Sequence, residues 1–146
     1  HHATLIQEVV RMLCAGVVHG DLSEFNILLA HMPGDNGADG MDEPVIIDLP
    51  QAVDAAGNNH AQRMLLRDVG NLRDFFGQFA PALLKTDYGP EIWSLYQAGL
   101  LGNDTPLTGH FERAHADVDM VAVLREIDDA RAEDAARRLR MATPPA

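Results

Sequence analysis

Two aspartates and an asparagine are the residues of this chain whose types and spacing fit shared chemistry. Asp21 and Asn26 lie five residues apart in the run His19–Leu28, and Asp48 ends the apolar run Val45–Asp48. Carboxylate and amide oxygens can orient a hydroxyl group, accept its proton and bind Mg²⁺. These residues therefore predict a site for a hydroxyl acceptor, a phosphoryl group and a divalent cation.

Two short strands are expected to position these side chains. β-Branched and aliphatic residues predict strands over Asn26–Ala30 and Val45–Leu49, and Gly, Asp and Asn dominate residues 34–40 between them. The pattern predicts a β-hairpin. A hairpin would bring the two aspartates and the asparagine together.

Apolar periodicity predicts helices around this hairpin. The predicted ranges are Ala3–Ala15, about Asn58–Gly77, a helix opened by Pro90, and about Val118–Met141, with a loop over Gly102–Gly109. Their expected core residues include Leu5, Val9, Met12, Leu13, Ile92, Trp93, Leu95, Tyr96, Leu100, Val121, Leu124 and Ile127. The fold class is therefore α+β, mostly α.

Asp68 lies on the apolar stripe of the second predicted helix. Ala61, Leu65, Leu72 and Phe76 share this stripe. Because burying an unpaired charge costs several kcal/mol, Asp68 needs hydrogen-bond partners. We expect it to accept backbone N–H groups from a neighbouring loop.

Length and composition limit the other possibilities. The 146 residues predict one domain, with a helix, loop and hairpin over 1–57, a helical part over 58–142 and a tail over 143–146. The net charge of −11 argues against direct nucleic acid binding. Neither a membrane span nor a signal peptide is expected, and the single cysteine, Cys14, is expected to be a buried thiol in a reducing cytoplasm.

Three segments carry a resemblance to a known family. The run His19-Gly20-Asp21-Leu22-Ser23-Glu24-Phe25-Asn26-Ile27-Leu28 closely resembles the catalytic loop of the RIO family of atypical protein kinases. Ile46–Val53 is similar to the metal-binding segment of that family, and Leu66–Phe76 is similar to the helix that follows it. The chain thus resembles the C-terminal lobe of a protein kinase domain.

The resemblance implies an ATP- and Mg²⁺-dependent serine/threonine protein kinase or ATPase. By position, Asp21 would be the catalytic aspartate, and Asn26 and Asp48 would bind the metal beneath the ATP phosphates. Asp48 would also accept phosphate transiently. Ser23 would contact phosphate or the metal, although a local turn hydrogen bond is an equal alternative. His19 is expected to be a packed scaffold residue.

The chain departs from the family pattern in two respects. Pro50 stands where the family usually has Ser, which removes a hydroxyl and a backbone N–H. No Gly-rich loop or strand lysine precedes the helix at Ala3–Ala15, and Lys85 is the only lysine. The N-terminal lobe of the kinase domain is therefore expected to be missing from residues 1–146.

Three interpretations follow from this incomplete pattern. In the first, these residues belong to a RIO-type kinase, and the fragment alone is inactive because it lacks the ATP lid. The second is a small-molecule kinase of the aminoglycoside or choline type, against which Ser23-Glu24-Phe25 and Leu49-Pro50-Gln51 argue. The third is a non-catalytic kinase-like binding module. The expected partners are ATP, a protein or small-molecule hydroxyl acceptor, the missing lobe, and a second copy of the chain through the exposed lobe interface.

Overall fold

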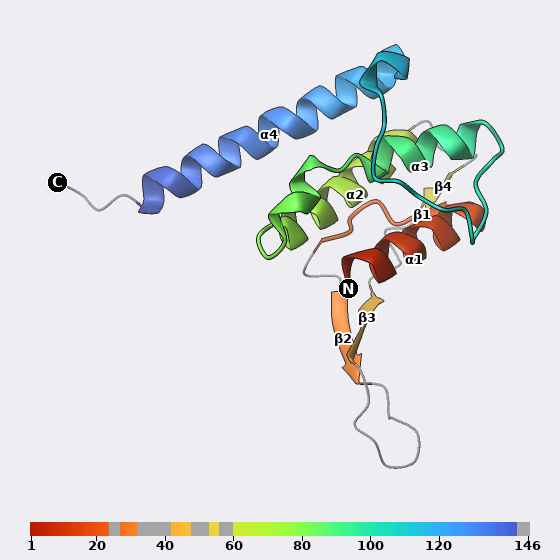
Figure 1. Cartoon of the computed structure of the whole chain (residues 1–146), viewed down its shortest axis with the longest axis horizontal. Coiled ribbons are helices and arrows are strands. Elements are labelled where there is room, and N and C mark those ends of the chain that lie inside the picture. Colours follow the sequence, from red (N-terminus) through yellow and green to blue (C-terminus); the bar gives the residue numbers. More distant parts are fainter. Residues whose placement is uncertain (24–26, 32–41, 48–52, 56–59, 143–146) are drawn as a thin grey trace. The chain divides into compact units, whose positions relative to one another are not determined.

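The structure is a computed structural model that describes residues 1–23, 27–31, 42–47, 53–55 and 60–142 (Figure 1). Residues 1–111 and residues 112–146 form two compact units. The predicted single domain, with its parts over 1–57, 58–142 and 143–146, stays a prediction. The described residues are mostly helical, as expected for the predicted fold class.

The first unit contains the described strands and three of the α-helices. Its elements are α1 (His2–Cys14), β1 (Val17–Val18), β2 (Ile27–His31), β3 (Asp42–Ile46), β4 (Val53–Asp54), α2 (Ala61–Gly77), the 3₁₀-helix η4 (Pro81–Lys85) and α3 (Tyr88–Gln97). The second unit contains the 3₁₀-helix η5 (Arg113–His115) and α4 (Val118–Ala142). The helices predicted from periodicity are all present, with shifts of a few residues at their ends.

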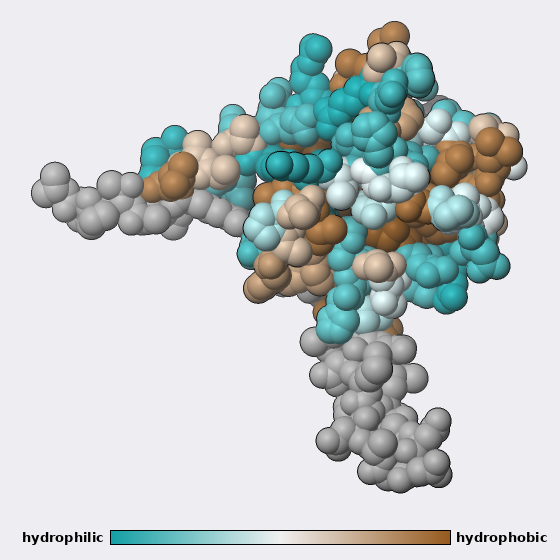
Figure 2. Space-filling model, viewed as in Figure 1, coloured by the Kyte–Doolittle hydropathy of each residue, from teal (hydrophilic) through white to brown (hydrophobic). Residues whose placement is uncertain are grey.

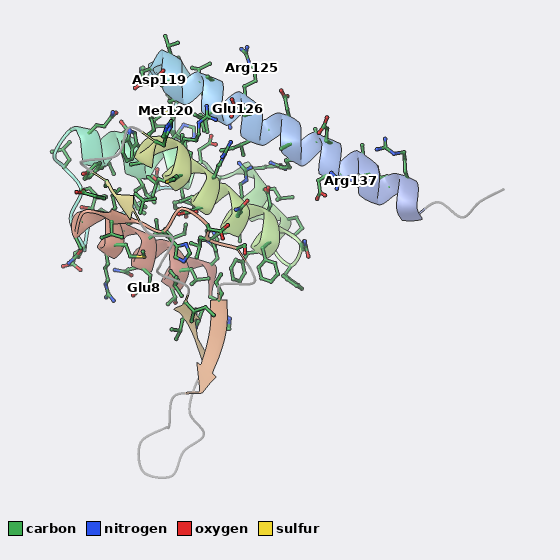
Figure 3. All side chains as sticks on the ribbon, turned by 180° about the vertical axis from the view of Figure 1, so that it is seen from behind. Glu8, Asp119, Met120, Arg125, Glu126 and Arg137 are labelled. Atoms are coloured by element: carbon green, nitrogen blue, oxygen red, sulfur yellow. The ribbon has the colours of Figure 1, made fainter. Side chains whose placement is uncertain are left out.

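Helix α1 forms because apolar residues recur at helical spacing along one side. Leu5, Ile6, Val9, Val10 and Leu13 are buried on this side. On the exposed side, Glu8 and Arg11 form an i,i+3 ion pair of 2.8 Å, and Glu8 is labelled in Figure 3. The predicted helix over Ala3–Ala15 is therefore confirmed to within one residue.

The prediction that Cys14 is a buried thiol is wrong. Cys14 is exposed, and its Sγ lies 3.8 Å from the carbonyl oxygen of Leu101. It is the last residue of α1, at the edge of the apolar stripe, where periodicity does not determine whether a side chain is covered.

The described part of the first unit contains two antiparallel strand pairs. Strand β1 pairs with β4, so that Val18 lies opposite Val53. Strand β2 pairs with β3, so that Ile27 lies opposite Ile46 and His31 opposite Asp42. The chain therefore enters the His19–Ser23 loop directly from a paired strand.

Helices α2 and α3 pack closely. A Cβ atom added at Gly89 of α3 would lie 3.2 Å from Cδ2 of Leu66 on α2, so even a methyl group would require the Leu66 side chain to shift. Ile92 and Trp93 of α3 are buried, as predicted. Leu100 is 67% exposed, contrary to the prediction, because α3 ends at Gln97 and Leu100 lies in the following loop.

Helix α4 begins after Asp117, whose Oδ1 accepts a 2.7 Å hydrogen bond from the backbone N–H of Met120. This is the bond expected of an N-cap aspartate. Charged side chains follow along α4, and Figure 3 labels Asp119, Arg125, Glu126 and Arg137 among them. Val121 is 40% exposed although Leu124 is buried, so the prediction that Val121 is buried is wrong.

The described surface of the first unit contains both hydrophobic and hydrophilic residues. Hydrophobic patches lie among hydrophilic ones on the face seen in Figure 2. Phe79, at the end of α2, is 75% exposed. Among the described residues, no helix combines the length and the apolar character needed to cross a bilayer.

Candidate functional site

The described part of the predicted site is the loop His19–Ser23, which follows β1. It contains Asp21, whose side chain is exposed, and Ser23, which is partly buried. The other two predicted site residues, Asn26 and Asp48, lie outside the described residues. Their predicted grouping with Asp21 therefore stays a prediction. The carboxylate of Asp21 is accessible to a ligand, as the proposed chemistry requires.

A buried carboxylate on α2 holds this loop in place. Asp68 is only 2% exposed, and its Oδ2 accepts a 2.8 Å hydrogen bond from the backbone N–H of Gly20. Its Oδ1 accepts a 3.0 Å hydrogen bond from the backbone N–H of Leu22. One carboxylate therefore binds the residues on both sides of Asp21. The prediction that Asp68 accepts N–H groups from a neighbouring loop is confirmed.

Gly20 gives the loop a conformation that other residues rarely adopt. Its φ of +89° lies in the left-handed region, where a Cβ atom is sterically disfavoured. The turn at Gly20 lets the N–H groups of Gly20 and Leu22 reach the same carboxylate. The Gly in the His-Gly-Asp sequence is thus explained by the backbone that this turn requires.

Burial raises the pKa of the Asp68 carboxyl above its ordinary value of 3.8. The hydrogen bonds from Leu22 and Gly20 act in the opposite direction, while the negative charge of Asp21 adds to the rise. Desolvation is therefore the largest effect, because removing a carboxylate from water disfavours its charged form. We call Asp68 and its hydrogen bonds to Gly20 and Leu22 the Asp68 clamp. Burial of its carboxylate has an electrostatic cost that these hydrogen bonds only partly offset.

His19 links the loop to the segment that follows β3. Its ring is 2% exposed, and Nε2 lies 2.8 Å from the carbonyl oxygen of Ile47. Its Nδ1 accepts a 3.2 Å hydrogen bond from the backbone N–H of Asp21. These two partners assign the neutral tautomer with the proton on Nε2, which donates to Ile47. The prediction that His19 is a packed, hydrogen-bonded scaffold residue is confirmed.

Asn71 makes a contact to the same loop that the sequence did not predict. Its Nδ2 donates a 2.9 Å hydrogen bond to the carbonyl oxygen of Leu22. Asn71 lies three residues after Asp68 on α2, so both side chains extend from neighbouring positions on one face of the helix. The spacing Asp-x-x-Asn was the available signal, but it becomes informative only when the loop it faces is known.

A groove of about 360 Å³ lies elsewhere in the first unit. Its walls come from one side of α1, from Tyr88 at the start of α3, and from residues 103–107. None of the His19–Ser23 loop residues is among the residues that form its walls. This groove is therefore separate from the described loop His19–Ser23.

Metal binding is expected of Asn26 and Asp48 rather than of the described residues. Within the described ranges, no group of three or more His, Cys, Asp or Glu side chains is arranged to hold a metal ion. The predicted ligands, Asn26 and Asp48, both lie in the undescribed segments. Their side chains offer the oxygen atoms that Mg²⁺ prefers, so the fit rests on their chemistry.

The fold is similar to that of a kinase. The crystal structure of a Rio2 kinase from Chaetomium thermophilum, in an ADP/Mg²⁺-phosphoaspartate complex, aligns with 88% of this chain and 39% of that chain. The TM-score is 0.55 and the sequence identity is 26%. This mostly helical chain therefore shares its fold with part of a protein kinase.

The family follows from the sequence comparison. Residues 1–88, which are more than half of the chain, match the RIO domain family. The chain belongs to the RIO-domain family, and the resemblance seen at His19–Leu28 is confirmed.

Two relatives are archaeal proteins named as kinases. The chain is 41% identical over 75 residues to the RIO-type serine/threonine-protein kinase Rio2 of Methanocaldococcus jannaschii, across 51% of this chain and 24% of that protein. It is 42% identical over 73 residues to the RIO-type serine/threonine-protein kinase Rio1 of Haloferax volcanii, across 49% of this chain and 21% of that protein. The matched region thus spans less than a quarter of each relative.

Proposed function

We propose that the parent protein, meaning the complete reading frame that encodes residues 1–146, is a serine/threonine protein kinase or ATPase that uses Mg²⁺-ATP. The observation that carries this proposal is the exposed Asp21 carboxylate, held between two backbone N–H groups that both bind Asp68. A carboxylate fixed through its backbone and open to ligands suits a group that orients a hydroxyl and takes its proton.

The proposed step is the transfer of the γ-phosphoryl group to a hydroxyl. Asp21 accepts the proton of the acceptor hydroxyl as its oxygen forms a bond to the γ-phosphorus. The bond between that phosphorus and the β–γ bridging oxygen breaks, and ADP leaves with the electron pair. Asn26 and Asp48 would hold Mg²⁺, which neutralises phosphate charge when bound. Ser23, partly buried at the end of the described loop, would face the phosphates.

Removing the Asp21 carboxylate tests this proposal. In the parent protein, Asp21→Asn should lower phosphoryl transfer from labelled ATP by at least about 100-fold, the range typical for loss of an acid–base group. Asp104→Asn is the matched control, because Asp104 is an exposed acid in the first unit outside the loop. Transfer at an unchanged rate in Asp21→Asn would overturn the assignment of Asp21. Absence of transfer in the parent protein itself would overturn the kinase proposal.

Asp48 is proposed to accept phosphate during the cycle. The Rio2 kinase structure from Chaetomium thermophilum is a phosphoaspartate complex, so an aspartate carries phosphate in that similar protein, and this supports testing the same chemistry at Asp48. The carboxylate oxygen would form a bond to the γ-phosphorus while ADP leaves. Hydroxylamine-sensitive label on the parent protein should disappear in Asp48→Ala, and label that persists would contradict this role.

Residues 1–146 alone are proposed to bind ATP very weakly and to turn it over negligibly. Lys85 is the only lysine of the chain, and it is exposed on η4. Phosphoryl transfer depends on positioned cationic groups as well as on the carboxylates. Titration of residues 1–146 with Mg²⁺-ATP in a calorimeter measures this, and robust transfer by this fragment would contradict it.

The acceptor class is a further part of this proposal. Two relatives are named serine/threonine-protein kinases, which supports a protein hydroxyl as the acceptor. A transfer assay that offers the parent protein casein, aminoglycosides and choline separates the alternatives. Label on the small molecules and none on protein would favour a small-molecule kinase.

A further inference from the structure

The geometry points to Asn71 as a positioning residue for Asp21. We infer that its side-chain amide fixes the carbonyl of Leu22 and so holds the catalytic loop in its working conformation. This inference rests on the proposed function of Asp21, although its structural part can be tested separately. Asn71 is not assigned to touch a substrate.

The argument begins with the peptide groups around Asp21. The N–H of Asp21 donates to His19 Nδ1 at 3.2 Å, which orients the peptide group before Asp21. The N–H of Leu22 donates to Asp68 Oδ1 at 3.0 Å, which orients the peptide group after it. The side chains of His19 and Asp68 therefore restrain the backbone angles φ and ψ of Asp21.

Asn71 supplies the restraint on the next peptide group. Its Nδ2 donates to the carbonyl oxygen of Leu22 at 2.9 Å, on the peptide that leads to Ser23. The side chain of Leu22 is 0% exposed. The N–H, the carbonyl and the side chain of Leu22 are thus all held, and Leu22 becomes a fixed point beside the exposed Asp21.

Helix α2 restrains Leu22 through two side chains. Asp68 and Asn71 extend from one face of α2 and bind opposite ends of the same residue, the N–H and the C=O of Leu22. Without Asn71, the carbonyl of Leu22 would lose this partner and the Leu22–Ser23 peptide could rotate. A misplacement of a reacting group by about 1 Å can lower the rate about 100-fold. Rotation of this peptide should therefore displace Asp21 and slow phosphoryl transfer.

The substitutions follow from the donor role of the amide. Asn71→Leu keeps a similar size and removes the donor, whereas Asn71→Asp places a carboxylate oxygen against the carbonyl oxygen. Asn71→Gln keeps an amide donor on a side chain longer by one methylene. Asn103→Asp is the matched control, because Asn103 is an exposed asparagine of the same unit and the same chemical change is made there.

In the parent protein, kcat should fall by about tenfold to 100-fold in Asn71→Leu and at least as much in Asn71→Asp. The KM for ATP should change by less than about twofold, since a positioning residue acts on the reacting geometry. Asn71→Gln should recover most of the kcat lost in Asn71→Leu. Equal kcat in Asn71→Asp and Asn103→Asp would overturn the inference, as would a loss explained fully by the unfolded fraction.

A second measurement uses residues 1–146 and needs no activity. Amide hydrogen exchange at Gly20 and Leu22 should become about tenfold faster in Asn71→Leu, because the loop opens more often once one hydrogen bond is lost. Exchange at Ile92 in α3 should stay unchanged. Unchanged exchange at Gly20 and Leu22 would overturn the positioning role. If Asp21→Asn left transfer intact, the proposed function would fail while this measurement still decided the role of Asn71.

Discussion

Two buried carboxylates of the first unit each accept hydrogen bonds from two backbone N–H groups. Only one of the two loops that they bind carries an exposed carboxylate, that of Asp21. Asp68 on α2 accepts the N–H groups of Gly20 and Leu22. Glu91 on α3, which is 9% exposed, accepts the backbone N–H groups of Thr108 and Gly109, each at 2.9 Å. Among the described residues, a carboxylate that binds two backbone N–H groups thus occurs on both α2 and α3.

The two clamps also share their requirement for glycine. Gly20 has a φ of +89° and Gly109 a φ of +75°, so each clamped turn uses a left-handed residue. A Cβ atom at Gly109 would also lie 2.9 Å from Cζ of Tyr88, so the second turn is packed as well as bent. Backbone shape alone therefore does not distinguish the loop that carries Asp21, the proposed catalytic residue, from the turn at Gly109.

The Asp68 and Glu91 clamps differ in the side chains of the backbone segments that they bind. Between the two N–H groups bound by Asp68 lies Asp21, with an exposed carboxylate. The two N–H groups bound by Glu91 come from consecutive residues, and the Thr108 hydroxyl turns inward to donate to Glu91 Oε2 at 2.7 Å. The Glu91 clamp binds only groups of its own turn, whereas the Asp68 clamp leaves the Asp21 carboxylate exposed.

The largest effect is expected from Asp68→Asn. The amide that replaces the carboxylate keeps one acceptor oxygen and places an NH₂ group against the other backbone N–H. Leaving a buried donor unsatisfied costs about 1–3 kcal/mol in the free energy of unfolding. Because the loop that carries Asp21 loses a restraint, kcat of the parent protein should also fall about 100-fold per folded molecule.

Steady-state phosphoryl transfer and urea unfolding measure these two quantities. Trp93 is the only tryptophan of the chain and is buried in α3, so its fluorescence reports unfolding of the first unit. An unchanged kcat in Asp68→Asn would mean that the Asp68 clamp, like the Glu91 clamp, has only a structural role. The proposed distinction between the two carboxylates would then be lost.

A smaller and purely structural effect is expected from Glu91→Gln. The same loss of one acceptor oxygen should lower the free energy of unfolding by about 1–3 kcal/mol, since a donor from Thr108 or Gly109 is left facing an NH₂ group. The kcat per folded molecule of the parent protein should stay within about twofold of the wild type. The same urea and transfer assays apply. A fall in kcat comparable to that of Asp68→Asn would show that the two clamps do not differ in function.

Sequence reasoning reached some of these features because they leave local signals. Helical periodicity located α1 and α2, and a carboxylate on an apolar stripe identified Asp68 as an acceptor of backbone N–H groups. Glu91 was not identified, and the spacing of Asn71 from Asp68 was not informative by itself, because a polar residue on a helix does not reveal the loop that it faces. Periodicity also failed for Leu100, because it does not fix where a helix ends. The grouping of Asn26 and Asp48 with Asp21 stays a prediction.

The smallest effect is expected in the pH dependence of stability, and it measures the cost of the Asp68 clamp. Burial raises the pKa of Asp68 above 3.8 in the folded chain. A raised pKa means that the folded chain binds the proton more tightly than the unfolded chain does. The contribution of Asp68 to the free energy of unfolding is therefore fully present below pH 3.8 and is lost as the pH rises through the raised pKa.

The difference in free energy of unfolding between wild type and Asp68→Asn isolates this contribution, because the variant has no titrating group at this position. The difference should decrease as the pH rises from 3.8 and then become constant above the raised pKa. Urea unfolding at a series of pH values, followed by Trp93 fluorescence, measures it. A difference that instead increases with pH would mean that the hydrogen bonds from Gly20 and Leu22 outweigh desolvation. The carboxylate form would then be the one that the fold prefers, and the clamp would have no electrostatic cost.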